Sequence, residues 1–450
     1  MNKREWTSFP DSKRTAVCAA ESGEQTMLNE KKISNYIEIL REELVLATGC
    51  TEPIAIAYAA ARLRAALGAR PEKIHADISG NIIKNTKSVV VPNTGGMKGI
   101  GSAIAAGIVA GREEAELQVI ADVSVAAQRE IARYAEQTPM EIACADTPLL
   151  LDIQLTGWAG EHSAFVRIAE SHSNVVRVEK NGEVLVDVPV AAGEGGTRTD
   201  RSSITVEEIL EFVNTVPVDA VRDILEPQIR CNSAIAEEGL KGDWGANIGS
   251  VLLKTSPVDI SVEAKAYAAA GSDARMSGCE LPVVICSGSG NQGMTASLPV
   301  IRYAKHLGVS EEQLYRALML SDLVTIHQKS GIGRLSAYCG AISAGVGAGA
   351  GIAYLLDGSY EAIAHTIVNG VAILSGTICD GAKPSCAAKI AAAVEAGILG
   401  YQMYRSGQQF YGGDGIVTKG VDNTIVNVGI LAKEGMRQTD EVILQIMTGR

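Results

Sequence analysis

The chain has 450 residues, of which 46% are hydrophobic, 20% are charged and 4% are aromatic. This apolar fraction excludes a disordered chain, and the length exceeds what one hydrophobic core usually supports, so two domains are expected. The chain has 40 Lys and Arg residues and 52 Asp and Glu residues, and the resulting net charge of −12 would repel a phosphate backbone. Composition therefore argues against a nucleic-acid-binding protein.

The N-terminal stretch, residues 1–32, is polar and has no apolar run of signal-peptide length, so it predicts a disordered extension, with Met27 as an alternative start. Nine cysteines without a secretory signal predict reduced thiols and a cytoplasmic protein. The uncharged stretch between Arg334 and Asp357 is mostly Ala, Gly and Ser, whose transfer into lipid gains little free energy. A buried helical core is therefore favoured over a membrane span.

The first half of the chain alternates between helical and strand patterns. Period-two alternation in three segments between Leu149 and Val188, together with the turn pair Asn181-Gly182, predicts antiparallel strands and a hairpin. Residues 33–195 are therefore expected to form an α+β domain. Its other predicted elements are helices over 34–48 and 54–67, strands over 74–79 and 88–92, and a small-residue helix that opens at 93–101.

The second half shows helical patterns with Gly- and Ala-rich runs and no sustained strand alternation. Residues 193–201 (GEGGTRTDR) are rich in glycine and charge, which is typical of a linker. We therefore expect an all-α domain over 203–450. With 47 glycines and few aromatic residues, its core must close gaps through tight contacts between small side chains. The predicted fold class is α+β, an N-terminal α+β domain joined to this helical domain.

Three cysteines carry the strongest chemical signal. Cys339 opens a small-residue helix, and Cys379 and Cys386 bracket the loop CDGAKPSC, whose Gly and Pro let two thiolates turn toward one point. Three thiolates on an iron–sulfur cube would leave one iron open to substrate as a Lewis acid. Ordinary buried cysteines are the alternative, since free Cys is often buried and the spacing is not a standard ferredoxin pattern.

Two further patterns involve the segment 279–293. Cys279 and Cys286 repeat the separation of Cys379 and Cys386, so these four residues are an alternative four-cysteine site for structural zinc or a redox cluster. The segment 288–293 (GSGNQG) matches the G-x-G-x-x-G motif of dinucleotide-binding proteins, but Pro299 interrupts the helix that should follow. A turn that offers N–H groups and Asn291 to a small anion is the better interpretation.

A second candidate site lies near the start of the chain. Cys50 and Thr51 come directly before a predicted helix, and Pro53 suits its first turn. A helix N-terminus can hold a carboxylate, and its field is expected to lower the pKa of Cys50. A plain helix cap formed by Thr51 or Glu52 accounts for the same pattern.

The segment 93–101 is a similar candidate anion-binding turn, with Asn93 and Thr94 at its start and Lys98 as a charge partner. Side chains on the preceding loop are expected to face the same cavity; these are Asn81, Lys84 and Asn85. Among the histidines, His327 is expected to be a polar neighbour of the site.

Five segments together resemble the L-cysteine desulfidase family, which is related to the iron–sulfur L-serine dehydratases. The resemblance extends over nearly the whole chain from about residue 30. The segments are ATGCTEPIAIAYAAA (47–61), GNIIKNTKSVVVPNTGGMKGIGSAIAAG (80–107), SGSGNQGMTASLPV (287–300), CGAISAGVGAGAG (339–351) and ICDGAKPSCAAKIAAA (378–393).

The resemblance implies a 4Fe–4S enzyme that eliminates sulfide from L-cysteine, giving pyruvate and ammonia without pyridoxal phosphate. It implies that Cys339, Cys379 and Cys386 are the cluster ligands and that Cys50 is the base that takes the α-proton. The related dehydratases carry a Ser/His-rich loop where this chain has GCTEP, which favours cysteine over serine as substrate.

Elimination is then expected between the two domains, a common place for pockets. The residues expected to bind the substrate are Thr51, Asn81, Asn93, Thr94, Lys98 and Asn291. The alternatives are the same lyase acting on L-serine or L-threonine and, from another class, a non-catalytic zinc or redox protein with four cysteine ligands. The expected partners are the amino-acid substrate and, in a homodimer, a second copy of the chain, with no nucleic acid and no membrane.

Overall fold

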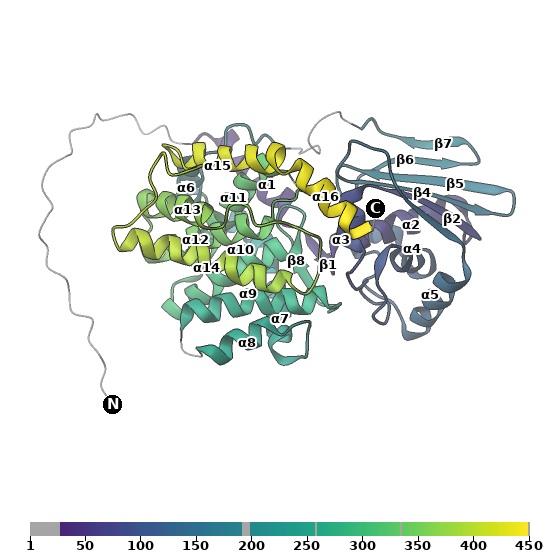
Figure 1. Ribbon diagram of the computed structural model, residues 1–450, viewed down its shortest axis with the longest axis horizontal. Coiled ribbons are helices and arrows are strands. Elements are labelled where there is room, and N and C mark those ends of the chain that lie inside the picture. Colours follow the sequence, from purple (N-terminus) through teal and green to yellow (C-terminus); the bar gives the residue numbers. More distant parts are fainter. Residues whose placement is uncertain (1–27, 191–198, 257–258, 334, 449–450) are drawn as a thin grey trace, which may run out of the picture.

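The computed structural model describes residues 28–190, 199–256, 259–333 and 335–448. A sheet with helices on one face lies beside a larger body of helices (Figure 1). The predicted α+β fold class is thereby confirmed. The predicted extension up to residue 27, and most of the predicted linker, lie outside the described residues, while the first helix already begins at Glu30.

The main sheet has six strands in the order β3-β2-β4-β5-β6-β7. Neighbouring strands are antiparallel except for the parallel pair β2 and β3. Asn181 and Gly182 both have positive φ and join β6 to β7, so the predicted hairpin is confirmed. The strands are β2 (Lys73–Ile78), β3 (Met140–Cys144), β4 (Asp152–Ala159), β5 (His162–Ala169), β6 (Val175–Lys180) and β7 (Glu183–Asp187).

The strand predicted over 88–92 is wrong. This segment makes a single bridge, between Val90 and Lys98, because Pro92 has no N–H to donate to a ladder and the chain turns back directly after it. The helix predicted over 34–48 ends at Glu43, and Leu46–Thr48 (β1) pairs instead with Pro282–Val284 (β8).

Helices cover one face of the sheet. Almost every residue of α2 (Thr51–Leu67) is buried, because small alanines let it lie close to both the sheet and α4 (Gly99–Ala110). A Cβ on Gly107 of α4 would lie 2.1 Å from the carbonyl oxygen of Ala57. The remaining helices of this part are α3 (Gly80–Thr86), the 3-10 turn η1 (Glu113–Gln118) and α5 (Val125–Gln137).

The second part of the molecule is a helical core that also includes the first helix of the chain. Tyr36 of α1 stacks on Phe212 of α6 at a ring separation of 5.0 Å. The helices are α1 (Glu30–Glu43), α6 (Val206–Thr215), α7 (Arg222–Lys241), α8 (Ile248–Thr255), α9 (Ile260–Met276), α10 (Gly290–Leu307), α11 (Glu311–Ile332), α12 (Gly340–Leu356), α13 (Tyr360–Leu374), α14 (Cys386–Arg405), α15 (Val421–Ile430) and α16 (Arg437–Thr448), with short turns η2 (Val218–Ala220) and η3 (Leu431–Gly435).

Glycines bring the central helices of this core into backbone contact. A Cβ on Gly397 of α14 would lie 2.2 Å from the carbonyl oxygen of Gly345 and 3.1 Å from the Cα of Gly349, both in α12. The uncharged run that forms α12 is therefore a buried, closely packed helix, as the small-residue pattern predicts. Across the described residues, no helix is both long and apolar enough to cross a membrane.

The C-terminal helix α16 connects the two parts (Figure 1). Asp440 of α16 forms an ion pair with Lys84 of α3, whose side chain is buried. Leu444 fits against Gly80, where a Cβ would lie 2.4 Å from its Cδ2 atom. This contact helps to hold the sheet part against the helical core and so positions the space between them.

A buried carboxyl lies within the helical core. Asp322 of α11 is fully buried, and its Oδ1 atom accepts a hydrogen bond from Gln228 of α7 at 3.0 Å. Burial raises the pKa of Asp322 to about 7, although the hydrogen bond from Gln228 acts in the opposite direction.

The close approach of α12 and α14 predicts a steric effect of one methyl group. Gly397→Ala is expected to lower the free energy of unfolding by about 1 to 3 kcal/mol, because the added Cβ meets backbone that cannot move aside. Gly101→Ala in α4 is the matched control, since its Cβ would find its nearest neighbour at 3.8 Å. Urea denaturation of both variants is the measurement, and equal midpoints would contradict the packing.

Asp322 predicts a pH dependence of stability. Because its folded pKa lies above its unfolded value, the folded state holds this proton more tightly, and stability falls as pH rises from about 4 to about 7. Asp322→Asn removes this term, so its stability relative to the unmodified protein rises with pH by up to about 1.4 kcal/mol per pH unit in that window. Denaturation at a series of pH values measures the difference, and parallel pH curves would contradict it.

Candidate active site

A cleft lies between the sheet part and the helical core. Residues singled out in the sequence line it together, among them Cys50, Asn291, Cys339, Cys379 and Cys386. They come from segments separated by more than 300 positions along the chain, and no local pattern brings them together.

Four helices begin at this cleft. Helices α2, α10, α12 and α14 start after Cys50, Ser289, Cys339 and Ser385. The first turn of each helix contributes lining residues. Because each helix N-terminus carries a partial positive charge, the cleft favours anions and thiolates.

Backbone hydrogen bonds hold two of the three C-terminal-half cysteines side by side. Cys339 N–H donates to the Thr377 carbonyl at 2.9 Å, and Cys379 N–H donates to the Ala337 carbonyl at 2.6 Å. Cys386 begins α14 on the same cleft wall, and its thiol lies 3.7 Å from the Gly381 carbonyl oxygen. Burial, together with the nearby thiols of Cys379 and Cys386, raises the pKa of Cys339 to about 12.

The donor set that this cleft offers is three thiols. In the described ranges, no group of three or more His, Cys, Asp or Glu side chains is placed to hold a metal ion. An iron–sulfur cluster binds each thiolate at a different iron, so its ligands need not meet at a point. Three thiols on one wall of a cleft surrounded by helix N-termini therefore fit such a cluster.

Two members of the alternative four-cysteine site do not line the cleft. Cys279 and Cys286 are buried in the helical core, whereas Cys379 and Cys386 line the cleft. The segment 288–293 is not a dinucleotide-binding turn either. It enters α10 from the short antiparallel strand β8, and α10 continues through Pro299.

Cys50 is hydrogen-bonded to an acidic partner that the sequence analysis treats only as a possible helix cap. Its Sγ atom lies 3.1 Å from Oε2 of Glu52, and both residues are buried. Thr51 donates to the same Oε2 at 3.1 Å and lies 3.0 Å from the Gly288 carbonyl, while Asn85 donates to Oε1 at 3.1 Å. These contacts hold the Glu52 carboxylate against the thiol.

The expectation of a lowered Cys50 pKa is wrong. Burial and the adjacent Glu52 carboxylate raise the pKa of Cys50 well above its usual value, and the Arg275 guanidinium offsets only part of this rise. The field of the helix N-terminus is outweighed because the thiol is removed from water. Cys50 is therefore a thiol whose proton is shared with a carboxylate, not a free thiolate.

Several predicted substrate-binding residues lie outside the cleft. Asn93 donates to the carbonyl of Ile120 at 2.8 Å, Thr94 is hydrogen-bonded to Val91 at 2.7 Å, and Lys98 is exposed before α4. Asn81 is buried in α3 and is not among the residues that line the cleft. The turn at 93–101 thus uses its polar side chains to hold its own loop.

The three other residues considered with this site have different surroundings. Asn85 lines the cleft, away from the turn at 93–101 with which it was expected to share a cavity, whereas Lys84 is paired with Asp440. His327 forms a hydrogen bond with Asp422 at 2.8 Å and does not line the cleft.

Sequence reasoning missed Arg275, His172 and Lys389, which line the cleft. Arg275 comes from the end of α9, His172 from the loop between β5 and β6, and Lys389 from the first turn of α14. Arg275 and His172 lie outside the segments that carry the resemblance, and Lys389 lies within 378–393 without having been considered, so only the folded arrangement indicates their place at the cleft. Lys389 is paired with Asp380 at 2.6 Å.

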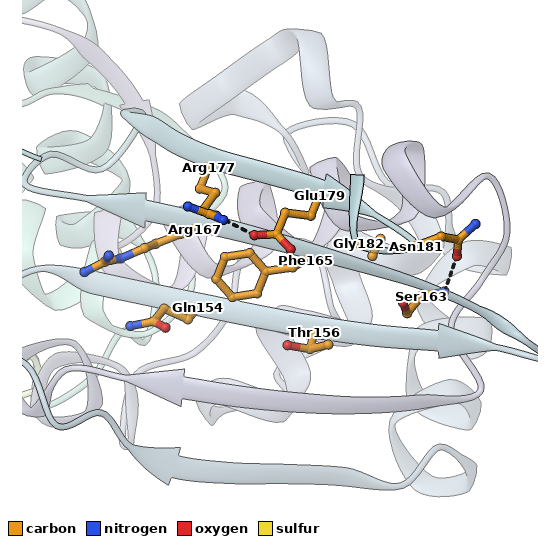
Figure 2. A pocket seen from close by; sticks show the side chains of 10 residues that line it. Gln154, Thr156, Ser163, Phe165, Arg167, Arg177, Glu179, Asn181 and Gly182 are labelled. Atoms are coloured by element: carbon orange, nitrogen blue, oxygen red, sulfur yellow. Dashed lines mark hydrogen bonds and ion pairs between the residues drawn. The ribbon is translucent and has the colours of Figure 1, made fainter. Parts of the chain in front are cut away.

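A second hollow lies on the open face of the main sheet (Figure 2). Its arginines are already paired: Arg167 with the buried Asp152, and Arg177 with Glu179, toward which it points in Figure 2. It contains no thiol or histidine among the described residues that line it. The chemistry-bearing residues are therefore gathered in the cleft and not on this face.

The comparisons with known proteins agree with this geometry. Residues 114–445 match the family described as serine dehydratase alpha chain. The UPF0597 protein of Desulfitobacterium hafniense is 57% identical over 418 residues, which cover 93% of this chain and 97% of that protein. The UPF0597 protein of Treponema denticola is 45% identical over 426 residues (93% and 99%), and that of Lachnoclostridium phytofermentans is 49% identical over 411 residues (91% and 98%). The matched region covers most of the chain and includes Asn291 and all three cysteines that line the cleft, so the chain belongs to the serine dehydratase alpha chain family.

Proposed function

We propose that the protein is an iron–sulfur-dependent lyase that eliminates sulfide from L-cysteine, giving pyruvate and ammonia, without pyridoxal phosphate. The observation that carries the proposal is that Cys339, Cys379 and Cys386 share one cleft with the Cys50–Glu52 pair. The matched family supports an elimination from a β-substituted amino acid. The GCTEP segment at 49–53 supports cysteine as the preferred substrate.

Cys339, Cys379 and Cys386 are the proposed ligands of a 4Fe–4S cluster. Such a group, when bound by three thiolates, supplies a Lewis-acidic iron that polarises the substrate and stabilises the departing sulfur. The N-termini of α12 and α14, which begin at two of these cysteines, lower the cost of holding thiolates in a buried site.

The Cys50–Glu52 pair is the proposed proton acceptor. Because Glu52 lies 3.1 Å from the thiol, it takes the Cys50 proton as the thiolate takes the α-proton of the substrate. The raised pKa of Cys50 makes its thiolate strongly basic at the moment it forms. Thr51 and Asn85 position the carboxylate and so keep its free lone pairs directed at Cys50.

The elimination balances in atoms and electrons. The electron pair of the Cα–H bond forms the Cα–Cβ double bond, and the Cβ–S bond breaks with its electron pair leaving on sulfur as hydrosulfide. The product, aminoacrylate, tautomerises and is hydrolysed by water to pyruvate and ammonia after release. Glu52 returns its proton to water, and Cys50 regains its starting state.

The second candidate is an L-serine or L-threonine dehydratase that uses the same residues. The family description favours it. The same base and the same bond changes apply, with a hydroxyl group leaving as water. The two candidates therefore differ only in the leaving group that the cleft accepts.

Purification without oxygen tests the proposed function. We expect iron and acid-labile sulfide in equal amounts, and release of sulfide and pyruvate from L-cysteine at a higher kcat/KM than release of pyruvate from L-serine or L-threonine. A higher kcat/KM for L-serine would establish the second candidate instead. Iron-containing protein that turns over none of the three amino acids would contradict both.

Three substitutions separate the proposed roles. Cys50→Ser and Glu52→Gln are each expected to lower kcat about 100-fold or more, since each removes part of the proton acceptor, while iron and sulfide contents stay unchanged. Cys339→Ser is expected to lose both iron and activity. Cys144→Ser on the exposed surface of β3 is the control and is expected to match the unmodified protein. Full turnover by Cys50→Ser would refute the base, and full iron content in Cys339→Ser would refute the ligand.

A further inference from the structure

Arg275 is a buried cation in the cleft without a charged partner among the described residues. The residue is 2% exposed and lies near the end of α9. Its Nε donates to the Gly49 carbonyl at 3.1 Å, and its Nη1 donates to Oδ1 of Asn291 at 3.2 Å. Both acceptors are uncharged, and Arg275 forms no ion pair with any residue in the described part of the chain. A buried charge without a counter-charge is costly, so this position points to an anionic ligand.

The surrounding backbone is shaped around this guanidinium. A Cβ on Gly290 would lie 2.4 Å from Nε of Arg275, so the start of α10 has room for the arginine only because residue 290 is glycine. On the other side, Gly49 has a φ of +69°, and a Cβ there would lie 2.0 Å from Pro92. The Gly49 carbonyl that binds Arg275 therefore belongs to a turn that only glycine accommodates.

The other charges on the cleft wall are already engaged. Glu52 accepts hydrogen bonds from Cys50, Thr51 and Asn85, and Lys389 is paired with Asp380. The nearest carboxyl along α9, Asp273, accepts instead from the N–H of Gly249. Among the described residues that line the cleft, Arg275 is thus the cation left without an anion.

We infer that Arg275 binds the α-carboxylate of the amino-acid substrate, with Asn291 beside it as a second polar contact. The inference rests on the proposed function for the identity of the ligand. A guanidinium pairs with a carboxylate through two parallel hydrogen bonds, which fix orientation as well as position. Because Gly49 precedes Cys50, a carboxylate held at this arginine brings the adjacent Cα–H toward the thiol. This assignment replaces the carboxylate site expected around Asn93 and Thr94.

Binding of L-alanine to the anaerobically purified holoenzyme isolates this contact, because L-alanine has the carboxylate but no leaving group. By titration calorimetry, we expect L-alaninamide, which lacks the carboxylate, to bind at least about 100-fold more weakly. Arg275→Met is expected to lose the same factor for L-alanine, with iron content unchanged, and Arg275→Lys to lose less. Arg70→Met, which removes an exposed arginine paired with Glu130, is the control and is expected to bind normally.

Rescue distinguishes a ligand contact from a purely structural role. In Arg275→Ala, added guanidinium ion at millimolar concentration is expected to restore both L-alanine binding and the preference over L-alaninamide. In kinetics, Arg275→Met is expected to raise KM for L-cysteine about 100-fold, with a smaller change in kcat.

Equal binding of L-alanine and L-alaninamide by the unmodified holoenzyme would overturn the inference, even where a substitution at Arg275 impairs folding. Unchanged L-alanine binding in folded Arg275→Met would also overturn it. Carboxylate-dependent binding through Arg275 in a holoenzyme that turns over no amino acid would support the anion site and refute the proposed lyase. If substitutions at Arg275 leave the turnover of L-cysteine unchanged, the proposed lyase activity would be supported and this contact would be refuted.

Discussion

The site depends on the convergence of four helix N-termini on one cleft. Helices α2, α10, α12 and α14 begin after Cys50, Ser289, Cys339 and Ser385, so the positive ends of four helix dipoles lie around the thiols. A buried thiolate or carboxylate is costly in an apolar core, and this arrangement is what makes a negatively charged site tolerable there. The cysteines, the Cys50–Glu52 pair and Arg275 all act within that field.

Close backbone packing makes the convergence possible. Helices α12 and α14 meet at Gly345, Gly349 and Gly397, and α2 meets α4 at Gly107, with no room for a methyl group at these contacts. Helices held this close can start from neighbouring points and direct their first turns into a shared space. The abundance of glycine and the scarcity of aromatic residues thus relate directly to the site, and the contact of α16 with α3 keeps the opposite wall in place.

Parts of this arrangement follow from local pattern, and others do not. The strands around Asn181-Gly182 and the small-residue helix after Cys339 can be predicted from the sequence, because hydrophobic period and turn chemistry are local properties. The pairing of β1 with β8 cannot be predicted in this way, because strands of three residues show no period. The raised pKa of Cys50 cannot be predicted from local pattern either, because it depends on burial by residues more than 200 positions away. The polar side chains of Asn93 and Thr94 are hydrogen-bonded within their own part of the chain, and this too is visible only in the structure.

The fold class, the small-residue helix packing and, through resemblance, the set of cysteines that line the cleft can all be predicted from the amino-acid sequence. The pairing of charges becomes visible only in the folded chain. Glu52 is held by Cys50, Thr51 and Asn85, Lys389 by Asp380, and Arg275 is left with neutral acceptors among the described residues. The physical reason is that electrostatic pairing depends on distance through space and on exclusion of water, and neither can be read from positions along a chain.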